Sequence, residues 1–195
     1  MGEHQSTPPE RLIHRGRKFD FAVLTTTGRS GRPIEREIVR HPGAVILVPI
    51  LGRPESDERE LLLVRQTRPA PGKPMLELPA GTLEQGENPF GCAARELEEE
   101  TGHRAATVTS LGRFYTSPGM SDELMHAFVA TDLQATEAAP EDDEDIEVVR
   151  VGVSRISGMI EREELADGKS LAALTLAVIR GVLPADTFAG GAGAQ

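Results

Sequence analysis

The sequence predicts an α/β fold, in which a domain of strands and helices is preceded by an N-terminal β-hairpin extension. The first indication is residues 44–50 (AVILVPI), a continuous apolar run typical of a strand that is covered on both faces. The second is that strand-like and helical segments are interspersed along the rest of the chain. The third is size, because 195 residues, of which 38% are apolar, suffice for one hydrophobic core.

The predicted elements have recognisable boundaries. A hairpin is expected around the glycine- and proline-containing loop at 28–33. The clearest helix has Asn88 as its N-cap and Pro89 in its first turn, and it ends before Gly102. The expected strands are 21–27, 34–40, 44–50, 60–67, 75–79, 107–115, 123–131 and 146–153, and the expected helices are 90–101, 154–165 and 170–181. The last helix is apolar on most sides and should pack against the sheet.

The chain divides into three parts. We expect an extension at 1–43 that contains the hairpin, a folded domain at 44–183 and a flexible tail at 184–195. Residues 1–18 are polar and contain prolines, so we expect them to be loosely ordered. The extension carries eight basic and five acidic residues, so its net charge is +3. Because the whole chain has a net charge of −10, the remaining residues carry −13. Two interpretations of this basic arm stay open: a solvated segment, or a part that meets phosphate.

Composition disfavours several classes of function. The 21 Lys and Arg residues against 31 Asp and Glu give a net charge of −10, which disfavours general binding to nucleic acid or to an anionic membrane. The single cysteine, Cys92, cannot form a disulfide within the chain and suits a reducing compartment. No apolar run approaches the ~20 residues of a membrane span, and the N-terminus lacks the apolar core of a signal peptide. We therefore expect a cytoplasmic protein without nucleic-acid or membrane partners, in which a cation mediates contact with any anionic substrate.

The helix at 90–101 gathers carboxylates on one side. With Glu96 set at 0° and about 100° per residue, Glu100 lies at about +40° and Glu99 at about −60°, whereas position 98 points away. The residues of the neighbouring apolar face are Phe90, Ala93, Ala94, Leu97 and Thr101. Three like charges within ~100° of arc are unfavourable in an isolated helix, and among the helix residues Arg95 alone offers relief. A solvated charged stripe is one explanation, but a hard divalent cation, which prefers oxygen ligands, explains the cluster better.

The residues around this helix form a known pattern. From Gly81 the chain reads GTLEQGENPFGCAARELEEETG, in which Glu87 precedes the run REL-x-EE-x-G that ends at Gly102. This pattern resembles the signature of the Nudix hydrolase family at all of its fixed positions. The sequence departs from the family at His103, where the family usually has an aliphatic residue that packs rather than reacts.

This resemblance implies a fold and a chemistry. Nudix proteins fold as an α/β/α sandwich around a mixed sheet, and they hydrolyse a nucleoside diphosphate linked to another moiety, with Mg²⁺ or Mn²⁺ as cofactor. The implied metal ligands are Glu96, Glu99, Glu100 and the backbone carbonyl of Ala80, and Glu99 and Glu100 also count as catalytic. Structural support is implied for Gly81, Glu87, Arg95 and Gly102, with Glu87 and Arg95 orienting the carboxylates.

A second resemblance, over residues 20–180, is to the ADP-ribose pyrophosphatase branch of this family. It rests on Pro118 in the stretch YTSPG and on the strand VRQTRP at 64–69. It also rests on the acidic stretch at 140–147 and on the segment REI at 36–38. The implied reaction splits ADP-ribose into AMP and ribose 5-phosphate. The implied substrate-binding residues are Arg36, Glu37, Arg68, Pro118, Gly119 and Glu123.

The same resemblance implies a general base and a homodimer. Glu144 is the expected base, with Glu141 and Asp142 as close rivals in the same acidic loop. The extension is expected to cross to a second copy of the chain, so that Arg36 and Glu37 serve the partner's site. Cations at such a site neutralise pyrophosphate oxygens and lower the pKa of a bound water, which the base then deprotonates.

Alternatives remain at this point. Other Nudix enzymes cleave different substrates, such as GDP-mannose, NADH or oxidised nucleotides, and a non-catalytic ADP-ribose sensor is a further alternative. Arg68 is either a phosphate ligand or an ordinary surface arginine, and Phe19, Phe21 and Tyr115 fit a core role as well as adenine stacking. The intact set of signature glutamates favours an enzyme, because degenerate sensors usually lose them.

Overall fold

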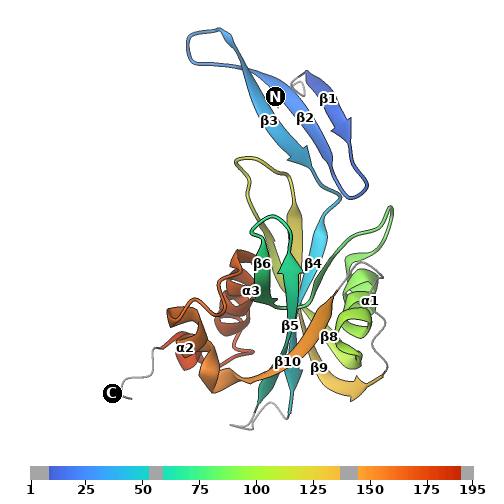
Figure 1. Cartoon of the computed structure of the whole chain (residues 1–195), viewed down its shortest axis with the longest axis vertical. Coiled ribbons are helices and arrows are strands. Elements are labelled where there is room, and N and C mark those ends of the chain that lie inside the picture. The colour runs from blue at the N-terminus through green and yellow to red at the C-terminus, as the bar shows by residue number, and fades with distance from the viewer. Residues whose placement is uncertain (1–8, 53–58, 137–144, 190–195) are drawn as a thin grey trace, which may run out of the picture.

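Figure 1 shows the computed structural model of the chain, which describes residues 9–52, 59–136 and 145–189. The strands are β1 (Glu10–Arg15), β2 (Asp20–Thr27), β3 (Pro33–Arg40), β4 (Ala44–Leu51), β5 (Glu60–Arg68), β6 (Lys73–Glu77), β7 (Ala80–Thr82), β8 (His103–Tyr115), β9 (Leu124–Ala135) and β10 (Ile146–Gly152). The helices are α1 (Pro89–Thr101), α2 (Ile156–Glu161) and α3 (Gly168–Ile179), with short 3-10 helices η1 (Val153–Arg155) and η2 (Ala185–Phe188).

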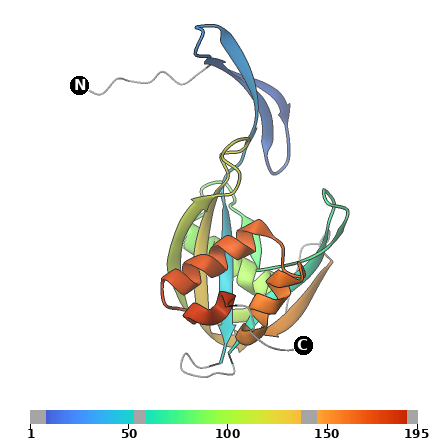
Figure 2. The ribbon, with the colours of Figure 1, turned by 90° about the vertical axis from the view of Figure 1, so that its left-hand side faces the viewer.

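A mixed sheet forms the centre of the body. Its strand order is β10-β5-β4-β9-β8, with β6 beside β5 and β7 beside β4. β4 and β9 run parallel, whereas the other neighbours in this sheet run antiparallel. α1 covers one face and α2 and α3 cover the other, as Figure 1 and Figure 2 show. This arrangement confirms the predicted α/β/α sandwich, and no helix in the described part of the chain is long and apolar enough to cross a membrane.

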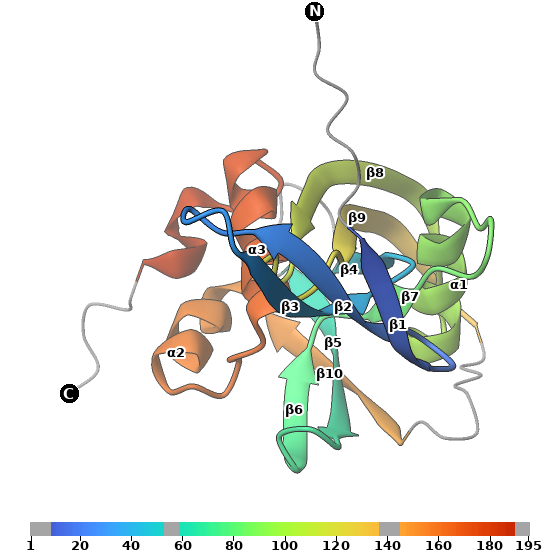
Figure 3. The ribbon, with the colours of Figure 1, turned by 90° about the horizontal axis from the view of Figure 1, so that it is seen from above.

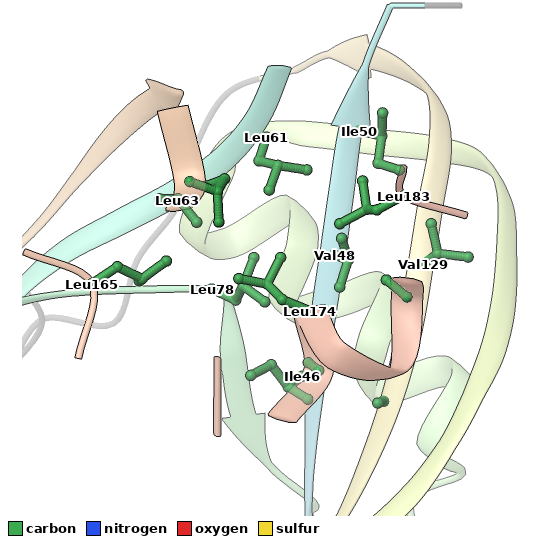
Figure 4. Close-up of a cluster of buried hydrophobic side chains, with 14 of the residues drawn as sticks. Ile46, Val48, Ile50, Leu61, Leu63, Leu78, Val129, Leu165, Leu174 and Leu183 are labelled. Atoms are coloured by element: carbon green, nitrogen blue, oxygen red, sulfur yellow. The ribbon is translucent and has the colours of Figure 1, made fainter. Parts of the chain in front are cut away.

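β4 divides the core into two halves because its side chains alternate between the two faces of the sheet. Val45 and Leu47 belong to the cluster on the α1 side. Ile46 and Val48 belong to the larger cluster on the other side, where Leu174 of α3 packs (Figure 4). All five side chains are fully buried. The apolar run is therefore covered on both faces, as predicted.

The N-terminal sheet rises from one end of the body (Figure 1) and, seen from above, lies across it (Figure 3). β2 and β3 form the predicted hairpin, and β1 adds an antiparallel strand beside β2. The sheet is fastened at its base, where the N–H of Val39 donates to the carbonyl of Met120 at 2.8 Å. Arg40 joins Glu10 of β1 and Asp122 of the body, at 2.7 and 2.8 Å. These contacts fix the base of the extension to the body.

Several boundaries differ from the prediction. β1 lies within the segment 1–18, which we expected to be loosely ordered, because it completes the edge of β2. β7 was not predicted as a strand and forms by pairing with β4. α2 is shorter than the predicted 154–165, because η1 precedes it and Glu163 beyond it has a positive φ of 57°. η2 lies in the segment 184–195 that we expected to be flexible, and its Thr187 is buried.

Candidate active site

Helix α1 begins and ends as its sequence predicts. The Asn88 side chain accepts a hydrogen bond of 2.9 Å from the N–H of Phe90, and Pro89 occupies the first turn. At the other end, Gly102 has a φ of 64°, and its N–H donates to the carbonyl of Glu98 at 2.9 Å. This left-handed conformation favours glycine and terminates the helix. The caps therefore fix where α1 begins and where it ends.

Glu96 and Glu100 lie within the buried face of α1, whereas we had expected them to lie beside it. The buried residues of the helix are Cys92, Ala93, Glu96, Leu97, Glu100 and Thr101. Glu96 is 9% exposed and Glu100 3%, whereas Phe90 and Ala94, which we placed on the apolar face, are exposed. The predicted face was correct for Ala93, Leu97 and Thr101, which are buried. It missed Glu96 and Glu100, because strand β7 packs on this side of the helix and offers its polar backbone to the carboxylates.

β7 meets these carboxylates with backbone atoms. The N–H of Ala80 donates a hydrogen bond of 3.0 Å to Glu100 Oε2. A Cβ atom on Gly81 would lie 1.9 Å from both the carboxyl carbon and Oε1 of Glu96. No side chain fits in that space unless Glu96 moves. The signature glycine is therefore required for close approach between β7 and α1.

Arg95 joins three carboxylates. Its Nε and Nη2 donate to the two oxygens of Glu87 at 3.1 and 3.2 Å, while Nη1 lies 2.8 Å from Glu96 Oε1 and 2.8 Å from Glu99 Oε2. The hydrogen bonds with Glu87 are the main reason why the pKa of Arg95 is raised, and those from Arg95 lower the pKa of Glu87. This geometry supports the orienting role expected of Arg95 and Glu87.

The residue types at this site fit a hard divalent cation. One guanidinium shared by three carboxylates leaves an excess of two negative charges, and carboxylate oxygens are the ligands such cations prefer. Among the described residues, however, no three Asp, Glu, His or Cys side chains form a ready ligand cluster. Arg95 bridges Glu96 and Glu99, and Glu100 contacts the Ala80 N–H. Cation binding at Glu96 and Glu99 would therefore exchange contacts with Arg95 for contacts with the metal.

Arg68 is paired with a buried carboxylate. Its Nε and Nη2 donate to the two oxygens of Glu77 at 2.9 and 2.7 Å, and Lys169 of α3 contacts the same carboxylate. Burial opposes ionisation of Glu77, but the bonds from Arg68 and the charge of Lys169 outweigh it, so the pKa of Glu77 is lowered. Glu77 is also the main reason why the pKa of Arg68 is raised, and the charge of Glu100 contributes. Arg68 is thus close enough to Glu100 for their charges to interact. Its contact with substrate phosphate stays a prediction.

The loop between β8 and β9 lies at the base of the N-terminal sheet. Pro118 and Gly119 form a turn here, closed by the N–H of Met120, which donates to the carbonyl of Ser117 at 3.0 Å. Glu123, next to β9, accepts a hydrogen bond of 2.5 Å from the Thr116 hydroxyl. These contacts hold the turn and Glu123 at the junction of the two sheets. The substrate-binding roles of Pro118, Gly119 and Glu123 stay predictions.

A cavity of about 520 Å³ opens beside Glu96. α1, the loop after β7 and the turn between β1 and β2 form its walls, and Arg17 and Lys18 line it from that turn. Neither Arg17 nor Lys18 was predicted as a site residue. The available signal was the excess of basic residues in the first 43 positions.

Arg36 and Glu37 lie in the exposed part of β3. This strand rises away from the body (Figure 1), so the two side chains are presented to solvent or to another molecule. Phe19, Phe21 and Tyr115 are 52%, 36% and 57% exposed, which excludes the core role that we had kept open for them.

The acidic loop is only partly described. The expected base Glu144 and its rivals Glu141 and Asp142 lie outside the described residues. β10 begins just after this loop and pairs with β5, placing Ile146 opposite Gln66.

Known proteins are similar to this chain in sequence and in fold. The sequence model of the NUDIX domain matches residues 40–174. An ADP-ribose pyrophosphatase of Bacillus subtilis (strain 168) is 37% identical over 183 residues, which is 93% of this chain and 96% of that protein. A methanol dehydrogenase activator of Bacillus methanolicus is 37% identical over 172 residues, which is 87% of this chain and 90% of that protein.

A solved structure supports the same assignment at the level of the fold. It is described as the crystal structure of an ADP compounds hydrolase and superposes with a TM-score of 0.73 at 23% identity, covering 96% of this chain and all of that one. Because the NUDIX match spans more than half of the sequence and includes the signature around α1, the chain belongs to the Nudix family.

Proposed function

We propose that this chain is a pyrophosphohydrolase that splits ADP-ribose, or a closely related nucleoside diphosphate sugar, at the pyrophosphate bond. The products expected from ADP-ribose are AMP and ribose 5-phosphate. The observation that carries the proposal is the pair of buried carboxylates, Glu96 and Glu100, held by Arg95 and by the backbone of β7 beside a cavity. The name of the Bacillus subtilis relative supports ADP-ribose as the substrate.

A divalent cation is a general requirement of Nudix hydrolases, and we propose Mg²⁺ here, with Mn²⁺ as a substitute. When bound, such a cation neutralises pyrophosphate oxygens and lowers the pKa of a water. The residues that would hold it are Glu96, Glu99, Glu100 and the backbone carbonyl of Ala80. Arg95, itself bound by Glu87, orients Glu96 and Glu99. Arg68 supplies positive charge to the substrate phosphates, and Glu144 accepts the proton of the attacking water.

We further propose a homodimer in which the extension of each chain serves the site of its partner. The extension exposes apolar side chains, which are more stable when another surface covers them. These are Leu12, Ile13, Phe19, Phe21 and Ile34. Arg36 and Glu37 project from the same sheet and suit the nucleoside end of a substrate bound to the partner. The cytoplasmic location that we expect rests on the single cysteine, Cys92, which is buried and free.

A second function calls for a direct test, because one relative is named an activator of methanol dehydrogenase. A regulatory or sensing protein could bind the same ligand without turnover. The full set of signature glutamates, Glu96, Glu99 and Glu100, favours hydrolysis over binding alone.

The experiment is a substrate panel with the purified chain. ADP-ribose, GDP-mannose, NADH and an oxidised nucleoside triphosphate are each incubated with Mg²⁺, with Mn²⁺ and with chelator, and the products are separated by chromatography. We expect ADP-ribose to give the highest kcat/KM, equal amounts of AMP and ribose 5-phosphate, and no turnover with chelator. Preference for another substrate would reassign the substrate. Binding of ADP-ribose by calorimetry without turnover would instead support a sensor.

A further inference from the structure

A buried polar cluster joins α3 to the segment that precedes the α1 carboxylates. Ser170, in the first turn of α3, is fully buried. Its hydroxyl accepts a hydrogen bond of 2.8 Å from the N–H of Leu78 and donates one of 2.6 Å to Asp167. Asp167 also accepts the N–H of Ser170 at 3.0 Å, so it caps α3 and orients the hydroxyl. Asp167 thus orients the Ser170 hydroxyl, and the hydroxyl in turn binds the main chain at Leu78.

Three consecutive residues after β6 are each tied to a different element. The N–H of Leu78 is bound by Ser170 of α3. The carbonyl of Pro79 accepts the N–H of Leu47 of β4 at 2.9 Å. The N–H of Ala80 donates to Glu100 of α1 at 3.0 Å. Leu78 is therefore only two residues from the N–H that Glu100 accepts, so little main chain is available to absorb a shift at Leu78 before it reaches Ala80.

Lys169 and Glu77 form a second contact between the start of α3 and the end of β6. Lys169, beside Ser170 on α3, contacts Glu77, beside Leu78, and it also donates to Asp167 at 2.9 Å. Glu77 is 1% exposed and holds Arg68 through two hydrogen bonds. The start of α3 thus fixes both the approach to β7 and the guanidinium near Glu100.

We propose that Ser170 is a positioning residue for the cation site: through residues 78–80 it sets where Glu100 and the carbonyl of Ala80 stand. The inference rests on the proposed function, because it takes Glu100 as a ligand of the cation. Loss of the hydroxyl leaves the buried N–H of Leu78 without an acceptor, a state that the chain relieves by moving. A Cβ atom on Gly81 would lie 1.9 Å from the Glu96 carboxyl carbon, so movement of β7 toward α1 at this point would have to displace that carboxylate.

The test compares two hydroxyl deletions on the same helix. Ser170→Ala removes the hydroxyl that holds Leu78, whereas Thr175→Ala removes an exposed hydroxyl that only bonds the carbonyl of Leu171 in its own helix. Mn²⁺ binding to each folded, nucleotide-free variant is measured by electron paramagnetic resonance of the free ion, well below the unfolding temperature. We expect Ser170→Ala to weaken Mn²⁺ binding about three- to tenfold, with a fall in kcat and little change in KM for ADP-ribose. Thr175→Ala should bind Mn²⁺ like the wild type.

The outcomes separate this inference from the proposed function. Wild-type Mn²⁺ affinity in a folded Ser170→Ala variant, even one that unfolds at lower temperature, would leave Ser170 a purely structural role and overturn the inference. If Ser170→Ala does not fold, Ser170→Cys replaces it, because the thiol retains a weak acceptor for the N–H of Leu78. We expect this variant to bind Mn²⁺ more weakly than the wild type. Wild-type affinity in Ser170→Cys would overturn the inference. A wild-type chain that does not bind Mn²⁺ at all would overturn the proposed function itself.

Discussion

Gly81 and Glu96 are packed so closely that a Cβ atom on the glycine would lie 1.9 Å from the carboxyl carbon of the glutamate. β7 carries Gly81 and α1 carries Glu96, so the strand comes this close to the Glu96 carboxylate because residue 81 has no side chain. The same strand holds Glu100 through the N–H of Ala80. Backbone geometry therefore positions the carboxylates as much as side-chain packing does.

Gly81→Ala is expected to disable the site with little effect on the fold. The added methyl group must displace the Glu96 carboxylate, and a misplacement of ~1 Å can cost about 10²-fold in kcat. The matched control is Gly91→Ala on α1, where a Cβ atom meets nothing within 4 Å. Steady-state kinetics on ADP-ribose and thermal unfolding of both variants provide the measurement. Normal kcat in Gly81→Ala would show that Glu96 tolerates displacement.

Glu144→Gln is expected to lower kcat far more than it raises KM. A general base acts in the transition state and contributes about 10²- to 10⁴-fold, so its loss leaves substrate binding largely intact. Glu141→Gln and Asp142→Asn are the controls from the same loop. Near-normal kcat in Glu144→Gln, together with a large loss in one of the controls, would move the role to that neighbour.

Glu77→Gln is expected to destabilise the fold by about 2–4 kcal/mol near pH 7, because it removes the buried negative charge that Arg68 and Lys169 share. The folded-state pKa of Glu77 is below the ordinary 4.5, so its stabilising effect is fully present above that value. The effect is lost as the pH falls through the folded-state pKa. Urea unfolding from pH 7 to pH 3 should therefore show a gap between wild type and variant that narrows below about pH 4.5.

Glu147→Gln is the control for this pH dependence. Glu147 forms an exposed pair with Arg65 at 2.6 Å, with 64% of its side chain exposed. Such pairs contribute ~1 kcal/mol or less, so the free energy of unfolding should change little at any pH. A gap for Glu77→Gln that stays constant down to pH 3 would mean that the charge of Glu77 does not stabilise the fold.

Mixed dimers test whether the extension acts on the partner's site. Arg36→Ala and Glu96→Gln should each be nearly inactive alone. In a mixed dimer with shared sites, one site carries both defects and the other carries neither. Random exchange makes about half of the dimers mixed, so roughly a quarter of wild-type activity should return. No recovery, with subunit exchange shown independently by mass, would place Arg36 in its own chain's site or in none.

Much of the fold could be predicted from the sequence because its signals are local. Asn88, Pro89 and Gly102 mark the ends of α1 through capping chemistry, and the apolar run of β4 indicates burial on both faces. β1 and β7 were missed because their extended conformation depends on pairing with a neighbouring strand. Neither has an apolar pattern of its own. β1 forms by pairing with β2, and β7 forms by pairing with the start of β4, away from the two β4 residues that pair with β5.

The site could be predicted only as far as its residues lie on one element. The spacing of Glu96, Glu99 and Glu100 predicted how these side chains are distributed around the axis of α1. Which of them are buried depends on β7, and a helical projection contains no information about neighbouring strands. The pairing of Glu77 with Arg68 joins β6 to β5 and was missed because Glu77 belongs to no recognised sequence motif. The contact of Ser170 with Leu78 was also missed, because the two residues lie 92 positions apart in the sequence.

The most direct test compares glutamates on opposite faces of α1. Glu96 and Glu100 lie in the buried face against β7, whereas Glu98 pairs with Arg104 at 2.7 Å. kcat for ADP-ribose hydrolysis is measured in Glu96→Gln, Glu100→Gln and Glu98→Gln at saturating Mg²⁺, with circular dichroism as a check on folding. We expect losses of orders of magnitude at Glu96 and Glu100 and near-wild-type activity at Glu98. Equal losses at Glu98 and Glu96 would contradict a catalytic site built on the buried face of α1.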